Sequence, residues 1–174
     1  SIGARRGYLF FEFYEQGKTE ERYKAAYGQD MPSQLVAGLM NGDAVYVDLD
    51  GDGIITEEYD QMYMGTTDNP QYTFSLNFSL QYKNFDFSML WAGATKVSRA
   101  LDGVYRQPFG QQYNSSLLQW VVDNAWTPET ASSAKLPRIT FANEKQNQAN
   151  SNVWYYDSKY LRLKNLEIGY NIKD

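Results

Sequence analysis

The sequence predicts an all-β fold, namely a fragment of an antiparallel transmembrane β-barrel with several strands, long extracellular loops and one short helix in a loop. Three observations lead to this prediction. Residues 72–82 alternate strictly between apolar and polar side chains, a two-residue connector joins them to a second alternating run, and a long polar stretch, residues 92–153, comes before the next strand pattern. Short turns at one end and long loops at the other are typical of outer-membrane barrels.

The first 42 residues predict one strand and a surface loop. Residues 8–14 are almost continuously aromatic or aliphatic, which favours a strand that is buried on both faces or lies near a membrane interface. Residues 15–42 are rich in charged side chains and include Pro32, Gly38 and Gly42. They predict a surface loop with one short helix.

Residues 72–82 give the clearest periodic signal. Every even position is apolar or aromatic and every odd position is polar and uncharged, so a helix is excluded. An eleven-residue strand that rises ~3.3 Å per residue and tilts by ~45° spans about 25 Å, the height of an outer-membrane apolar band. A soluble sheet with one wet face is the alternative, but such a face usually carries Lys and Glu. Here the polar side chains are small and suit a wet barrel interior: Thr73, Ser75, Asn77, Ser79 and Gln81.

Lys83 and Asn84 then predict a hairpin turn, in which Asn84 takes the left-handed backbone conformation. The second strand covers residues 85–91, with its apolar side chains at odd positions until Leu90 breaks the alternation. If the turn is periplasmic, residues 15–71 and 92–153 both lie outside the cell.

Residues 92–153 are predicted to form a long extracellular loop, and loops of this length are usually functional. Apolar residues in its middle recur with helical spacing, which predicts one short helix: Leu117, Leu118, Val121, Val122 and Ala125. Asn114, Ser115 or Ser116 is expected to cap its start, and Pro128 to stop it.

Residues 160–172 predict the last strand. Their apolar positions are odd through Leu163 and even from Leu166 to Ile172. A slip of one residue at Lys164 and Asn165 indicates a β-bulge, so we expect one bent strand. Because the chain starts without Met and stops inside this pattern, we expect it to be a fragment of a longer protein.

Composition excludes several classes of function. The 174 residues contain no Cys and no His, which excludes disulfides, zinc sites of the usual kind, haem and iron–sulfur ligation, and Ser-His or Cys-His nucleophiles. A net charge of −5 offers no basic surface to a phosphate backbone, so nucleic acid is not expected as a partner. Because the chain has no Cys or His ligand to offer, any bound metal must be a hard cation with oxygen ligands.

The acidic loop within residues 43–65 resembles the start of an EF-hand calcium loop. Its expected ligands are three alternating carboxylates, a backbone carbonyl and a hydroxyl, with Gly53 at the sharp turn: Asp48, Asp50, Asp52, Ile54 and Thr56. Position twelve holds Tyr59, a poor ligand, flanked by Glu58 and Asp60. Either a neighbour takes its place, for which we choose Asp60, or the affinity for metal is weak. Ca²⁺ is expected ahead of Mg²⁺, and the alternative is an Asp/Gly turn that binds no metal.

Several motifs, in the same order, resemble the C-terminal barrel region of the SusC/RagA family of TonB-dependent transporters. The motifs are residues 41–43, 45–53, Gly65, 69–70, 83–86, 126–129, 136–138, 160–166 and 169–170. The resemblance implies a large outer-membrane barrel with an N-terminal plug, energised through TonB and covered outside by a SusD-like lipoprotein. It further implies import of oligosaccharides or peptides in Bacteroidetes-type bacteria, with the plug, the TonB box and the last strands absent from this chain.

The resemblance implies a transporter and no enzyme. Five aromatic residues are candidates for stacking on sugar rings or binding a partner, with packing inside the loop as the alternative: Trp120, Trp126, Trp154, Tyr155 and Tyr156. A secreted, calcium-stabilised β-rich glycan-binding module is the second hypothesis. A glycoside hydrolase is the third, with Asp102, Asp123, Glu129 and Glu144 as its candidate carboxylates. Arg99, Arg106 and Arg138 are candidates for binding an acidic substrate, with solvated arginines as the alternative.

Overall fold

The computed structural model describes residues 5–65, 67–107 and 116–172 and divides them into two compact units. The strand unit contains residues 65–99, apart from 66, and 156–172. The loop unit contains Arg5–Met64 together with the described part of Ala100–Tyr155. Most regular structure is antiparallel strand, as the sequence predicted. No helix in the described ranges is long and apolar enough to cross a membrane.

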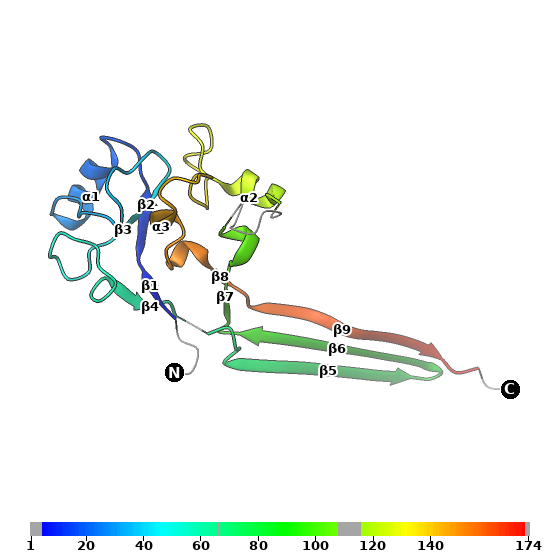
Figure 1. Ribbon diagram of the computed structural model, residues 1–174. Helices are drawn as coiled ribbons and strands as arrows, with labels where there is room; N and C mark the ends of the chain where they lie inside the picture. Colours follow the sequence, from blue (N-terminus) through cyan, green and yellow to red (C-terminus); the bar gives the residue numbers. More distant parts are fainter. Residues whose placement is uncertain (1–4, 66, 108–115, 173–174) are drawn as a thin grey trace. The chain divides into compact units, whose positions relative to one another are not determined.

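The strand unit is built around three long strands, β5 (Tyr72–Tyr82), β6 (Phe85–Thr95) and β9 (Tyr160–Tyr170), which form one antiparallel sheet in the order β5-β6-β9 (Figure 1). Strand β5 has the predicted boundaries. Strand β6 continues to Thr95, four residues past the predicted end, because small residues such as Ala92 and Gly93 keep pairing with β5 although they carry no hydropathy signal.

The pairing register gives this sheet one apolar face and one polar face, because directly paired residues project to the same side. Three rows cross the sheet on the apolar face: Leu76-Trp91-Leu163, Phe78-Met89-Leu166 and Leu80-Phe87-Ile168. The rows between them form the polar face, such as Ser79-Ser88-Glu167. On β5 the apolar side chains Phe74, Leu76, Phe78 and Leu80 are 44% to 62% exposed in this chain.

A bulge in β9 keeps this separation of faces intact. Leu90 pairs with Asn165 and Trp91 pairs with Leu163, so Lys164 is the extra residue. The bulge confirms the slip read from the sequence. It places Leu161 and Leu163 on the same face as Leu166, Ile168 and Tyr170, although the two sets have opposite parity along the chain.

The turn between β5 and β6 has the predicted length of two residues, but its left-handed residue is Lys83 (φ 54°) and not Asn84. The tight turns that suit a hairpin require a positive φ at their first central position, which Lys83 occupies. Strands β7 (Ser98–Ala100) and β8 (Tyr155–Asp157) form a separate short pair.

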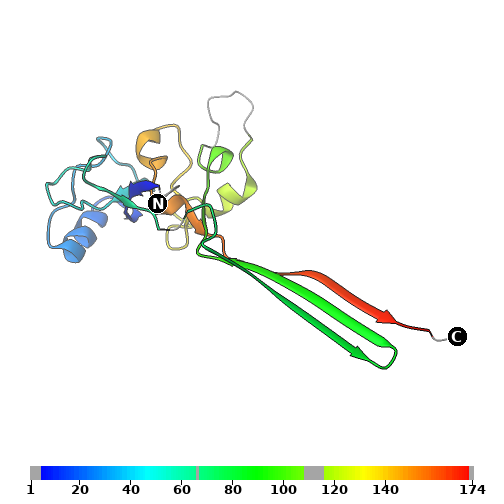
Figure 2. The ribbon, with the colours of Figure 1, turned by 90° about the horizontal axis from the view of Figure 1, so that it is seen from below.

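The loop unit contains short strands and short helices (Figures 1 and 2). Its first segment holds β1 (Arg6–Tyr8), β2 (Phe10–Phe13), α1 (Thr19–Tyr27), β3 (Ala44–Tyr46) and β4 (Gln61–Tyr63). Its second segment holds η1 (Gly103–Tyr105), α2 (Gln119–Asn124), α3 (Glu144–Asn147) and η2 (Asn152–Trp154). The strand predicted for residues 8–14 is divided at Leu9, because β1 pairs with β4 whereas β2 pairs with β3. Helix α1 is the short helix expected within residues 15–42.

Two small hydrophobic clusters hold the loop unit together. Tyr8, Ala44, Tyr46 and Ile55 form the first, in which the rings of Tyr8 and Tyr46 stack with their centroids 5.1 Å apart. Val121, Leu136 and Trp154 form the second, with Leu117 and Leu118 packed against it. This packing determines where α2 begins: Leu118 is its N-cap, without a side-chain cap. Ser116 is therefore not the cap, and Asn114 and Ser115 lie outside the described residues.

Candidate cation site and aromatic surface

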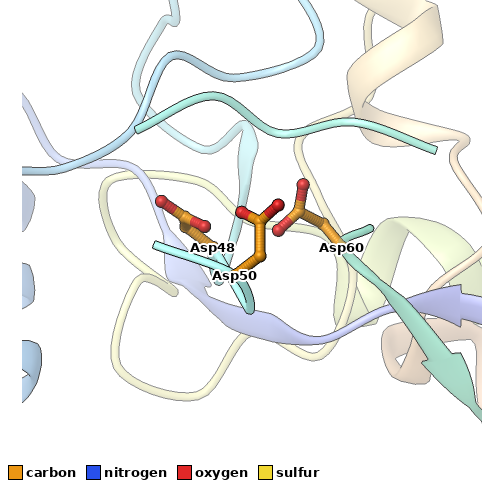
Figure 3. Close-up of side chains that lie close together, drawn as sticks. All are labelled: Asp48, Asp50 and Asp60. Carbon is orange, nitrogen blue, oxygen red and sulfur yellow. The ribbon is translucent and has the colours of Figure 1, made fainter. Parts of the chain in front are cut away.

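The acidic loop lies between β3 and β4 and gathers three carboxylates (Figure 3). One carboxylate oxygen from each of Asp48, Asp50 and Asp60 lies within 4.8 Å of the other two. Asp48 and Asp60 are buried, whereas Asp50 is exposed. The described residues thus bring together three of the six predicted ligands.

Asp48 organises the first turn of this loop. Its two carboxylate oxygens accept hydrogen bonds from the N–H groups of Gly51 (2.7 Å) and Gly53 (2.8 Å). Gly53 has φ 85°, which suits glycine at the sharp turn. Partial burial opposes ionisation of Asp48, but the hydrogen bonds from Gly53 and Gly51 outweigh it, so the pKa of this carboxyl lies below its usual value.

Asp60 closes the loop from its far end. It is fully buried and accepts hydrogen bonds from the backbone N–H groups of Leu49 (2.7 Å) and Thr56 (2.6 Å). Tyr59, which occupies EF-hand position twelve, is 59% exposed. Asp60, and not Tyr59, is therefore the residue at this end of the loop whose side chain lies close to Asp48 and Asp50.

Asp50 is destabilised as an anion. Desolvation raises the pKa of its carboxyl, and so do the charges of Asp52 and Asp60 and the hydrogen bond with Asp48. A hydrogen bond from the Asp52 N–H lowers this pKa but does not outweigh the other effects. A cation at this place would remove the repulsion between the three carboxylates, and their hard oxygen donors fit Ca²⁺ or Mg²⁺.

The other predicted ligands have separate roles in the structure. The Asp52 carboxylate accepts a hydrogen bond from the Ile54 N–H (2.8 Å), and the Thr56 hydroxyl donates to Asp60 (3.2 Å). Neither belongs to the carboxylate cluster in the described chain. Ile54 lies at a bridge to Ser33, which fixes the backbone on this side of the loop.

The five aromatic candidates differ in accessibility. Trp126 and Trp154 are only 8% and 3% exposed, so their rings pack inside the loop unit. The ring of Trp126 lies over Gly42, where an added Cβ would clash with the indole Cε3. Trp120 is 38% exposed and meets Tyr105 edge to face, with ring centroids 5.9 Å apart. Tyr155 and Tyr156 are half-buried, and burial raises the pKa of Tyr156.

Two of the three candidate arginines hold the loop unit together. Arg138 Nε lies 2.6 Å from the carboxylate of the fully buried Asp43. Asn143 and Asn147 donate to the same carboxylate at 2.6 and 2.8 Å. This network was missed by the sequence analysis, since its members are about 100 residues apart and no local pattern joins them.

Arg106 is also engaged within the loop unit. Its guanidinium donates to the Gln148 carbonyl (2.6 Å from Nε), pairs with Asp102 (3.3 Å), and lies 5.8 Å from the ring centre of Trp154. Arg99 is exposed.

Three of the four carboxylates considered for glycoside hydrolysis have partners in the structure. Asp102 pairs with Arg5 and Arg106, and Asp123 accepts a hydrogen bond from Gln119. Hydrogen bonds from its own backbone and from Thr127 lower the pKa of Glu129, whereas a general acid needs a raised value. Glu144 begins α3.

Comparisons with known proteins point in a different direction from hydrolysis. No protein-family model matches the chain. The chain is 29% identical, over all 174 residues, to TonB-dependent receptor P3 of Formosa agariphila, and 30% identical over 131 residues, 75% of the chain, to TonB-dependent receptor P26 of the same organism. It spans only 15% and 13% of the length of these relatives. Over its whole length, the chain is therefore similar to a limited part of a TonB-dependent receptor.

Proposed function

We propose that this chain is part of an outer-membrane, TonB-dependent importer. In this proposal β5, β6 and β9 belong to the wall of the barrel, and the loop unit, which includes the described residues from Ala100 to Val153 of the predicted long loop, lies on the extracellular side. Similarity to two TonB-dependent receptors supports the proposal. Cargo passes such a protein without bond making, so no catalytic residues are assigned.

The two-faced sheet is the observation that carries this proposal. Its apolar face is exposed in the chain and continuous across three strands, which is unusual for a protein surrounded by water. A bilayer accommodates such a face, and the polar face of Ser79, Ser88 and Glu167 then lines an aqueous interior. Tyr82, Phe85 and Tyr170 form the row at the turn end, where membrane barrels carry aromatic girdles.

The finer assignment is to the SusC/RagA type of importer. It rests on the ordered motifs of the sequence, from residues 41–53 to residues 160–170. On this assignment a SusD-like lipoprotein covers the outer side, oligosaccharides or peptides are the cargo, and TonB acts through a part of the receptor outside this chain. Trp120 is the most exposed of the three candidate tryptophans and is our choice for contact with cargo or lipoprotein.

We also propose that the acidic loop holds a structural Ca²⁺, with Asp48, Asp50 and Asp60 as carboxylate ligands. The convergence of three hard oxygen donors and the EF-hand spacing of Asp48, Asp50 and Gly53 support this proposal. Ca²⁺ is favoured over Mg²⁺ because it tolerates irregular coordination, whereas Mg²⁺ demands near-ideal octahedral geometry. Strands β3 and β4 flank the loop where an EF-hand has helices, so we assign it the role of fixing residues 43–65 rather than of sensing calcium.

Membrane insertion is tested with two neighbouring lysine substitutions in the polypeptide that carries this chain in its host. Leu76 is on the apolar face and Asn77 on the polar face of β5. Lys at a lipid-facing midplane position costs ~2–4 kcal/mol, whereas a lumen position tolerates it. Leu76→Lys should therefore abolish or strongly reduce the band that migrates faster unboiled than boiled, and Asn77→Lys should keep it in the outer-membrane fraction.

Equal sensitivity to both substitutions would contradict the assignment of the two faces. If the unsubstituted chain is instead folded and monomeric in plain buffer, the secreted, calcium-stabilised glycan-binding module becomes the better account.

A further inference from the structure

A groove in the loop unit runs beside β2 and has no role in the function proposed so far. Its volume is about 430 Å³, within the range of about 300–1,000 Å³ that is usual for small-molecule sites. All four residues of β2 line one side, and small side chains near Ser132 line the other. Trp126 closes part of the wall, so the groove has both aromatic and polar surfaces.

The polar rim of this groove is held in a fixed arrangement. Arg22 Nε lies 2.8 Å from a carboxylate oxygen of Glu12, and Arg22 Nη2 lies 3.1 Å from one of Glu15. The three side chains are between 25% and 43% exposed, so they remain accessible while each is oriented by another. Lys18 Nζ also lies 3.7 Å from the Glu15 carboxylate, so two cations balance two carboxylates. A rim without net charge favours an uncharged ligand over an acidic or a basic one.

The aromatic side of the groove owes its form to an irregularity in β2. The pairing with β3 shifts between Phe10 and Phe13, and the two rings meet with centroids 4.8 Å apart. Phe11 is anchored through edge contacts with Tyr23 (5.2 Å) and Tyr27 (5.7 Å). Half-buried, well-anchored rings lose little side-chain freedom when a ligand packs against them.

We propose that this β2 groove binds an uncharged sugar unit of an oligosaccharide. Anchored phenyl rings suit the apolar face of a sugar ring, and the Glu12–Arg22–Glu15 rim offers acceptors and donors together to its hydroxyl groups. The site rests on the proposed import function for its biological meaning, and it narrows the cargo from oligosaccharides or peptides to neutral oligosaccharides.

A peptide fits the groove less well. A peptide that adds to a strand needs a free strand edge. Residues 150–152 already occupy this edge where β1 passes into β2: the Tyr8 N–H donates to the Asn150 carbonyl (2.7 Å) and the Phe10 N–H to the Asn152 side chain (2.7 Å). The carboxylates of the rim are already paired with Arg22, which reduces their attraction for a basic side chain.

The test measures binding to the detergent-solubilised polypeptide by isothermal titration calorimetry. The probes are four neutral oligosaccharides (maltohexaose, cellohexaose, laminarihexaose and mannohexaose), the acidic hexagalacturonate and the basic peptide octalysine. Ser132→Trp fills the groove, and Ala131→Leu fills it less. Ser133→Trp is the matched control, because Ser133 is exposed, neighbours Ser132 and does not line the groove.

We expect at least one neutral oligosaccharide to bind, with affinity reduced at least tenfold by Ser132→Trp, less by Ala131→Leu and not at all by Ser133→Trp. The site is refuted if no neutral probe binds, if hexagalacturonate or octalysine binds instead, or if filling the groove changes nothing. Heat-dependent migration of the same samples reports barrel formation separately. A folded barrel without sugar binding therefore rejects the groove and leaves the proposed import function standing.

Discussion

At the residue scale, the acidic loop shows how one position decides the character of a site. The EF-hand pattern places Tyr59 where a carboxylate is needed, yet the buried Asp60 side chain reaches Leu49 and Thr56 and completes the cluster. Asp50 is the member whose ionisation is disfavoured, since its pKa is raised by desolvation and by neighbouring carboxylates. A bound cation should therefore depend more on Asp50 than on Asp52, whose carboxylate caps the Ile54 N–H.

Removal of the cation should expose this loop to protease. We expect Ca²⁺ to protect residues 43–65 from limited proteolysis and a chelator to abolish that protection. Asp50→Asn should cut the calcium-dependent protection strongly, whereas Asp52→Asn should retain most of it. Mass spectrometry of the fragments locates the cleavage. The structural calcium would be rejected by cleavage rates in the parent protein that do not change with chelator.

The contact between Tyr14 and Glu20 gives a pH dependence. The Tyr14 hydroxyl donates to a Glu20 carboxylate oxygen at 2.6 Å. This bond, with desolvation, raises the pKa of Tyr14 to about 12. Desolvation opposes ionisation of Glu20, but the bond from Tyr14 and backbone bonds lower its pKa below the usual value of 4.5. The lowered pKa of Glu20 means that the stability from its ionised form is lost as the pH falls through that pKa. The raised pKa of Tyr14 means that the stability from its protonated hydroxyl is lost as the pH rises through that pKa.

Tyr14→Phe should accordingly lower the free energy of unfolding by ~1.5–3 kcal/mol near neutral pH, since it deletes one hydrogen bond to a charged group. The difference from the parent should stay constant between the usual carboxyl and phenol pKa values. It should shrink as the pH falls below 4.5, where Glu20 is protonated in the unfolded chain, and vanish at lower pH, where Glu20 is protonated in the folded protein too. Chemical denaturation at several pH values measures it. Tyr27→Phe, an exposed tyrosine on the same helix as Glu20, is the control. A difference that grows on acidification would contradict this account.

At the element scale, the sequence predicted long strands far better than short ones. Strands β5, β6 and β9 each have eleven residues, enough for a period of two to be recognised, and even the bulge at Lys164 left a visible change of parity. Strand β3 has three residues, and it exists because Ala44 and Tyr46 pair with β2 across more than 30 residues of chain. Tertiary pairing of this kind leaves no local pattern.

The same distinction holds for the candidate site. Asp48 and Asp50 belong to one contiguous motif, so the proximity of their carboxylates could be predicted. The burial of Trp126 and Trp154 could not, because it depends on Gly42 and on the cluster around Leu136, which only the folded chain brings together. The groove beside β2 escaped prediction for the same reason, since it is lined from both segments of the loop unit.

The β9 bulge leads to a prediction about the sheet as an element. Deletion of Lys164 would remove the extra residue, so that either Leu161 and Leu163 or the set Leu166, Ile168 and Tyr170 must turn to the polar face. We expect the deletion to abolish the heat-modifiable folded form. Lys164→Ala keeps the residue count and should fold like the parent. Equal folded yields for the deletion and the parent would show that the bulge does not set the register.

At the scale of the whole molecule, the described chain combines a sheet suited to lipid with a loop unit that has its own hydrophobic clusters. In each of the two segments of the loop unit, a backbone hydrogen bond joins the beginning of the segment to its end. The Met64 N–H donates to the Arg5 carbonyl (2.9 Å), and the Leu101 N–H donates to the Trp154 carbonyl (2.7 Å). The buried pair Asp43–Arg138 then links one segment to the other. These contacts indicate that the loop unit requires no residue of the strand unit for its core.

We therefore predict that residues 5–64 joined to residues 100–155 by a Gly/Ser linker fold in water as a monomer with a cooperative thermal transition. A linker of ten residues reaches ~17–19 Å on average, and a longer one costs little more. Asp43→Ala in this polypeptide should cost ~3–5 kcal/mol, because it leaves the Arg138 charge without its buried partner. Asp30→Ala is the matched control, since Asp30 pairs with Lys24 at an exposed site. Circular dichroism and size-exclusion chromatography measure the outcome. Aggregation of the linked polypeptide without any substitution would mean that the strands, and the membrane around them, are needed to fold the loops.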